Sequence, residues 1–231
     1  MNRSIDIWMV AIVGTLLVLG LIMVYSASAV VAGDWTGDGT RYVLRQVAAL
    51  AVGGGLAAIT ALTPTRAMRR YRWAIYGAIL VALVLTYIPG IQQSAKGADR
   101  WIGFGSINLQ PSEFAKVGVL LVLAHYLDRW RGYIGDWRVL AQAALIPLPA
   151  LTLILLQPDF GTTAIISGLC FIMLYVAGLK PAHIGMMSAA GLAAGIPALV
   201  FEPYRLQRLI GFLDPFKYED GSGHQVIQSW I

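Results

Sequence analysis

The sequence predicts an all-α fold, a polytopic bundle of helices integral to a membrane. Of its 231 residues, 58% are hydrophobic and only 13% are charged, and the mean hydropathy is +0.68. A soluble domain has roughly 45–50% apolar and about 25% charged residues. The single cysteine, Cys170, excludes a disulfide framework and lies in an apolar run, which predicts a buried, unreactive thiol.

Seven apolar runs are long enough to cross a bilayer, which takes roughly 20 helical residues. They comprise residues 7–32, 43–62, 73–89, 111–127, 139–157, 161–179 and 184–201. The first run is longer than the apolar part of a signal peptide, so we expect an uncleaved helix. Residues 202–231 are polar and rich in turn residues. We therefore expect a single transmembrane domain over 1–231 that is incomplete at its C-terminus and ends in the start of a large outer loop.

The distribution of basic residues predicts the orientation. With the N-terminus inside, the cytoplasmic segments hold nine basic and three acidic residues, and the outer segments hold seven and eight. Four of the inner arginines fall in one short predicted loop: Arg66, Arg69, Arg70 and Arg72. Because Lys and Arg accumulate in cytoplasmic loops, we expect a multi-pass protein with a cytoplasmic N-terminus. The net charge of +5 does not indicate nucleic-acid binding, since the basic residues do not cluster on one soluble face.

Glu113 and Lys116 form a charged pair inside the fourth run, near its outer end. Residues three apart share one helix face and can neutralise each other. Pro111 is well suited to begin this helix, because a first-turn residue needs no N–H. Charged residues inside a membrane mark functional sites by default. A structural ion pair that fixes this helix against its neighbours is the alternative interpretation.

Two outer segments carry further polar residues. In the predicted loop from 92 to 110, Lys96 and Arg100 are able to hold a phosphate group, and Trp101 suits the membrane interface. A solvated basic pair beside an interfacial anchor is the alternative. Between the fifth and sixth runs, Pro158 ends one helix, and Asp159 either caps the next or takes part in catalysis.

The residues alone identify no cofactor. His125, His183 and His224 lack metal-ligand spacing, so no metal site is predicted, although a divalent cation stays open. Three classes of function remain at this point: a transporter or lipid flippase, an intramembrane transferase that uses a lipid-linked substrate, and a structural scaffold.

Five motifs, in their order and spacing, resemble the SEDS family, the FtsW/RodA/SpoVE proteins of bacterial division, elongation and sporulation. They are Val24-Tyr25-Ser26-Ala27-Ser28, Gly97-Ala98-Asp99-Arg100-Trp101-Ile102, Leu109-Gln110-Pro111-Ser112-Glu113-Phe114-Ala115-Lys116, Pro158-Asp159-Phe160-Gly161-Thr162 and Tyr204-Arg205 with Phe212-Leu213-Asp214-Pro215. Two further segments resemble the FtsW branch more than RodA: Tyr42 with Arg45 and Gln46, and Ile88-Pro89-Gly90.

The resemblance implies ten spans and a peptidoglycan glycosyltransferase of the bacterial cytoplasmic membrane. Its substrate would be lipid II, an undecaprenyl-pyrophosphate-linked disaccharide-peptide, polymerised at the outer face. Its implied partners are a cognate class B penicillin-binding protein and other divisome or elongasome proteins. The family's key aspartate lies further along the outer loop, so we expect the general base beyond Ile231. A lipid II flippase and a scaffold that recruits the transpeptidase remain the alternatives.

The resemblance also assigns roles to positions of this sequence. Glu113 and Lys116 are expected to organise the catalytic site, and Arg100 and Arg205 to contact the pyrophosphate. The full set expected to bind substrate is Arg100, Trp101, Gln110, Ser112, Asp159, Arg205 and Asp214.

Overall fold

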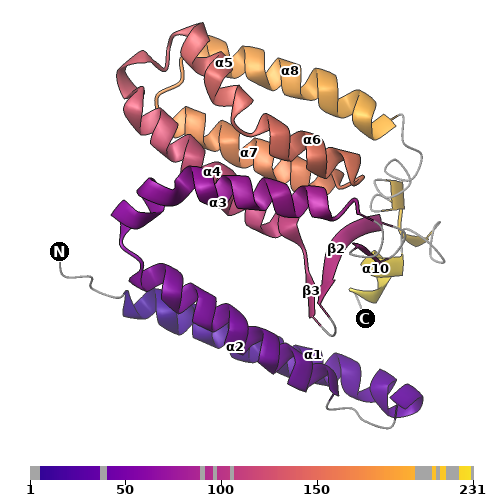
Figure 1. Cartoon of the computed structure of the whole chain (residues 1–231). Helices are drawn as coiled ribbons and strands as arrows, with labels where there is room; N and C mark the ends of the chain where they lie inside the picture. The colour runs from indigo at the N-terminus through magenta and orange to yellow at the C-terminus, as the bar shows by residue number, and fades with distance from the viewer. Residues whose placement is uncertain are drawn as a thin grey trace. The chain divides into compact units, whose positions relative to one another are not determined.

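Helices dominate the structure, a computed structural model, as the composition predicts (Figure 1). It describes residues 6–36, 41–88, 92–95, 98–104, 107–200, 210–211, 214–216 and 224–229. The helices are α1 (Ile7–Thr36), α2 (Arg41–Leu62), α3 (Thr65–Leu85), α4 (Pro111–Arg129), α5 (Trp137–Leu145), α6 (Leu148–Leu156), α7 (Phe160–Val176), α8 (Pro181–Val200), the short α10 (His224–Gln228) and the 3-10 turn η1 (Arg131–Tyr133). Each predicted apolar run coincides with one of these helices or with a helix pair.

The chain divides into two compact units, Met1–Met68 and Arg69–Ile231. In the first unit α1 packs against α2, and the apolar windows of both helices contain no buried residue. A helix that is apolar on all sides without being buried in protein suits a lipid environment. By length and composition these two described helices can cross a membrane, and a third span results if the bent pair α5 and α6 is counted as one. The count of seven spans stays a prediction.

The second unit has a core built from α3, α4, α6 and α7. Its largest fully buried apolar side chains are Leu83, Val119, Val122, Leu123, Ile154 and Ile166. Cys170 is buried in the same core, as predicted. At Gly118 of α4, an added Cβ would lie 2.6 Å from Cδ1 of Ile79, so glycine allows α3 to approach α4 closely.

The third helix is longer than predicted. It begins at Thr65, eight residues before the predicted start at Trp73. The four arginines assigned to a loop therefore lie in the first turns of α3. Arginine lowers the hydropathy of a segment but is a good helix former, so hydropathy locates the membrane-spanning part and misses the helical extension.

The fifth predicted run, 139–157, is two helices bent by 42° rather than one. Pro147 lies between α5 and α6 and Pro149 in the first turn of α6, and neither has an N–H to donate to the preceding turn. Tyr76 of α3 also bonds to this break, because its hydroxyl donates a 2.7 Å hydrogen bond to the carbonyl of Ile146, the residue before Pro147. Tyr76 itself is buried.

The segment predicted as a loop at 92–110 contains a sheet, so that prediction is wrong for the described part. Strands β1 (Gln92–Ala95), β2 (Ala98–Phe104) and β3 (Ile107–Leu109) form an antiparallel meander in the order β1-β2-β3. Ile102 of the central strand pairs with Gln92 on one side and with Leu109 on the other. These strands are only three to seven residues long and lack the run of β-branched residues by which strands are recognised.

We predict that Tyr76→Phe lowers the free energy of unfolding of the full-length protein by about 1–3 kcal/mol, because a buried carbonyl at the helix break loses its donor. Chemical or thermal unfolding in detergent measures the change. Tyr133→Phe is the matched control, because its ring is 65% exposed and the change removes only a surface hydroxyl. Equal stability of the two variants would contradict the role of Tyr76 at the break.

Candidate functional site

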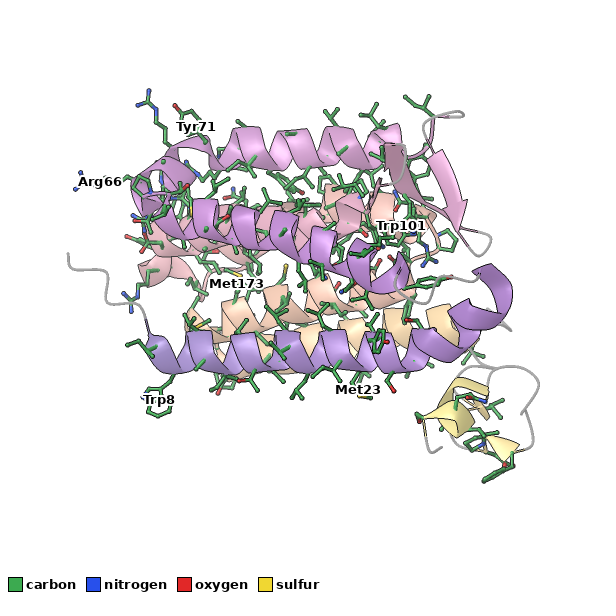
Figure 2. All side chains as sticks on the ribbon, turned by 90° about the horizontal axis from the view of Figure 1, so that it is seen from below. Trp8, Met23, Arg66, Tyr71, Trp101 and Met173 are labelled. Carbon is green, nitrogen blue, oxygen red and sulfur yellow. The ribbon has the colours of Figure 1, made fainter. Side chains whose placement is uncertain are left out.

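The candidate site lies at the end of the second unit where β2 packs against α4. Figure 2 shows Trp101 at this end and Tyr71 at the opposite end of the helices. Ile102 of β2 is only 4% exposed, so the strand packs against the protein. The pairing register between β1 and β2 shifts at Arg100, and the Arg100 side chain reaches the turn between α6 and α7.

Arg100 holds that turn through its guanidinium group. Its Nε donates to the carbonyl of Gln157 at 2.9 Å, and its Nη2 donates to the carbonyl of Pro158 at 2.7 Å. Its Nη1 lies 3.8 Å from Oδ1 of Asp159. A planar fork of fixed donors suits such multiple contacts, which the single ammonium of lysine cannot reproduce. Because Arg has five N–H groups, one on each terminal nitrogen is left for a further partner.

Asp159 caps α7, which is one of the two roles left open by the sequence. Its Oδ1 accepts from the backbone N–H of Thr162 at 3.1 Å, and its Oδ2 accepts from the Thr162 hydroxyl at 2.9 Å. Nε2 of Gln110, the residue before α4, donates to the same Oδ2 at 3.4 Å. The Asp159 side chain is 9% exposed, and its carboxylate links the starts of α4 and α7.

The sequence analysis missed two residues that support this turn from within, Gln157 and Thr86. Both are buried, at 3% and 0% exposure. Nε2 of Gln157 donates to Oγ1 of Thr86 at 2.7 Å, and that hydroxyl donates to the carbonyl of Leu83. Polar residues at the ends of apolar runs were the available signal, since buried polar groups in such runs need partners.

Glu113 and Lys116 meet in the first turns of α4, as their spacing predicts. Nζ of Lys116 lies 2.8 Å from Oε2 of Glu113. The Glu113 side chain is 55% exposed and that of Lys116 is 26% exposed, so the pair faces outward from the core of the described residues. The helix begins at Pro111, as expected, and the carboxylate lies in the first turn, where the helix dipole favours it.

The other four predicted positions differ from one another in their surroundings. Ser112 is fully buried, and its hydroxyl has no hydrogen-bond partner among the described residues. Trp101 of β2 is partly buried. Asp214 is exposed, and its backbone N–H donates to the carbonyl of Ile210. Arg205 lies outside the described residues, so its predicted pyrophosphate contact stays a prediction.

The site combines a tightly bonded inner layer with charged groups at its surface. Arg100, Gln110 and Asp159 bring β2, α4 and α7 together, and Glu113 and Lys116 follow directly on α4. Across the described ranges no group of three His, Cys, Asp or Glu side chains is placed to hold a metal ion. This arrangement is able to orient and hold a large polar or anionic substrate at one end of the helices.

The chain has the fold and composition of a polytopic membrane protein, and the comparisons assign its family. The model of the FtsW/RodA/SpoVE family of cell cycle proteins matches residues 7–231. The chain is 35% identical to the probable peptidoglycan glycosyltransferase FtsW of Pseudomonas fluorescens, over 100% of this chain and 57% of that protein. It is 34% identical to stage V sporulation protein E of Bacillus subtilis, over 99% of this chain and 63% of that protein.

Solved structures give the same assignment. One describes how a peptidoglycan synthase complex coordinates polymerization and crosslinking; it matches with a TM-score of 0.67 and 32% identity, over 92% of this chain and 62% of that one. RodA of Thermus thermophilus matches with a TM-score of 0.58 and 31% identity, over 77% of this chain and 57% of that one. The chain belongs to the FtsW/RodA/SpoVE family and is a bacterial membrane protein. It spans about three fifths of the length of these relatives.

We predict that Arg100→Lys loosens the turn between α6 and α7 in the full-length protein. Loss of the forked contact to two carbonyls should accelerate hydrogen exchange of the Thr162 and Thr163 amides by about tenfold, which corresponds to roughly 1.4 kcal/mol. Arg138→Lys is the matched control. Arg138 lies beside the ring of Trp137 at the start of α5, away from the turn between α6 and α7, so the same substitution should leave exchange at this turn unchanged. Unchanged exchange at Thr162 and Thr163 in Arg100→Lys would show that the guanidinium does not hold the turn.

Proposed function

We propose that the full-length protein is a peptidoglycan glycosyltransferase that polymerises lipid II at the outer face of the cytoplasmic membrane. The observation that carries this proposal is the convergence of Arg100, Gln110 and Asp159 at one end of the helices, beside the Glu113–Lys116 pair. These residues come from the motifs by which the sequence resembles its family. The names of the relatives support the reaction class.

In this reaction the 4-hydroxyl of an acceptor sugar attacks the anomeric carbon of a donor, a glycosidic bond forms, and undecaprenyl pyrophosphate leaves. A base must accept the hydroxyl proton, and cationic or N–H groups must balance the charge of the departing pyrophosphate. The remaining N–H groups of Arg100, with Arg205, are the donors we propose for the pyrophosphate. A divalent cation that accompanies the pyrophosphate is a further prediction.

The described carboxylates at this end support a base located elsewhere in the protein. Both oxygens of Asp159 already accept hydrogen bonds, and Glu113 is paired with Lys116. A carboxylate committed to capping a helix would have to give up these contacts in order to accept a proton from the substrate. We therefore assign positioning roles to Asp159 and Glu113, and expect the base beyond residue 231.

The same proposal includes sidedness and partners. We place the N-terminus in the cytoplasm, because the arginine-rich start of α3 and the candidate site lie at opposite ends of the helices. A class B penicillin-binding protein is the proposed partner, with divisome or elongasome proteins beside it. The similarity to a peptidoglycan synthase complex supports such an assembly. A lipid II flippase is less well supported, since the charged pair of α4 lies at its first turns rather than along a path through the helices.

We predict that the double variant Glu113→Leu with Lys116→Met keeps the thermal stability of the full-length protein but loses at least tenfold in lipid II polymerisation. Lys116→Met alone should be less stable, because it leaves the carboxylate of Glu113 without the ammonium group that lies 2.8 Å from it. Removal of both charges leaves no such unpaired charge, yet removes the groups that organise the site. Thermal unfolding in detergent and a polymerisation assay give the two readouts.

The charge-swapped variant Glu113→Lys with Lys116→Glu is the matched control. It keeps an ion pair three residues apart but exchanges the positions of the two charges. A purely structural pair predicts wild-type polymerisation in both double variants. That outcome would contradict the site role of Glu113 and Lys116. Absence of polymerisation by the unaltered full-length protein would contradict the proposed function itself.

A further inference from the structure

A groove with apolar walls and two charged residues lies at the opposite end of α4, away from the candidate site. The groove has a volume of about 350 Å³ and runs between the end of α4 and the end of α7. Its apolar wall consists of Ala124, Leu127, Ile172, Met173, Val176 and Ala177. Met173 is marked in Figure 2. Val176 is 78% exposed and Ile172 is 55% exposed, so the groove opens outward from the described helices.

The polar residues that line this groove are Asp128 and Arg131. Asp128 is already neutralised, because its Oδ2 lies 2.7 Å from Nη2 of Arg69. Arg131 is exposed and makes no ion pair within the described ranges. Asp128, its partner Arg69 and Arg131 together carry a net charge of +1, although Arg69 does not itself line the groove.

The apolar wall and the charge of Arg131 together favour one kind of ligand, an anionic lipid. Apolar walls gain free energy when hydrocarbon covers them, and a guanidinium binds a phosphate oxygen pair in a bidentate manner. A free phosphate ion would leave the apolar wall uncovered, and an uncharged lipid would leave Arg131 without a partner. Basic pockets between helices at the cytoplasmic side of a membrane are suited to anionic lipid headgroups.

We propose that this groove is a binding site for an anionic phospholipid of the inner leaflet. One acyl chain lies against the wall formed by α4 and α7, and the phosphate is bound by Arg131. The Arg69–Asp128 pair borders the headgroup. The proposal does not depend on the glycosyltransferase activity, since none of its residues belongs to the candidate site.

The test measures binding of phosphatidylglycerol to the full-length protein in detergent, by native mass spectrometry and by thermal unfolding. Phosphatidylcholine with the same acyl chains is the reference lipid. We expect phosphatidylglycerol to remain bound at one per protein and to raise Tm more than phosphatidylcholine does. Arg131→Gln should weaken its binding about fivefold, since one arginine near an anionic lipid surface contributes about 1 kcal/mol.

Two matched pairs of variants distinguish a specific lipid site in the groove from general electrostatic attraction to the protein surface. Arg138→Gln removes the same charge from a residue outside the groove and should leave binding unchanged. Ala124→Phe fills the groove without a change in charge and should weaken binding, whereas Ala164→Phe, at an exposed position of α7, should not. Equal binding of the two lipids, equal effects of the two arginine variants, or an inert Ala124→Phe would each overturn the proposal. The last outcome is the one expected if another part of the protein covers the groove.

Discussion

The contact of one guanidinium group with two backbone carbonyls determines how the candidate site is assembled. Arg100 joins a small sheet, which would otherwise have little to pack against, to the turn between α6 and α7. That turn carries Asp159, which caps α7 and accepts a hydrogen bond from the residue that precedes α4. The position of Glu113 and Lys116 follows, because they lie in the first turns of the helix whose start is fixed in this way. Gln157 secures the same turn from the interior through Thr86.

Helix α4 connects two ends of the second unit that differ in chemistry. One end carries the bonded polar layer and the charged pair, and the other carries Asp128 and a surplus of arginine. Between them α4 is buried against α3 and α7, with Gly118 allowing the close approach of α3. An apolar middle with two distinct polar ends fits the two roles proposed above, a transferase site at one end and a lipid site at the other.

Much of this architecture could be predicted from the sequence, because each strong signal has a local cause. Apolar runs located the helices and Pro111 located the start of α4. Asp159 was predicted either to cap the next helix or to take part in catalysis, and the structure shows the cap. The sheet at 92–109 was missed, since its short strands are formed by pairing with one another and not by propensity. The hydroxyl that bonds the carbonyl of Ile146 at the break before Pro147 comes from a tyrosine seventy residues earlier. The roles of Arg100, Gln157 and Thr86 depend likewise on contacts between segments far apart in the chain, which no local pattern reveals.

The most direct test of the central claim is a double-mutant cycle between Arg100→Lys and Thr86→Val, measured as the protection of the Thr162 amide from hydrogen exchange in the full-length protein. These two residues do not bond to each other, but both hold Gln157. Residues that act through a shared partner give non-additive effects, whereas independent residues give effects that multiply. The account predicts that the double variant is about as impaired as the more impaired single variant. A loss in the double variant equal to the product of the two single losses would contradict it.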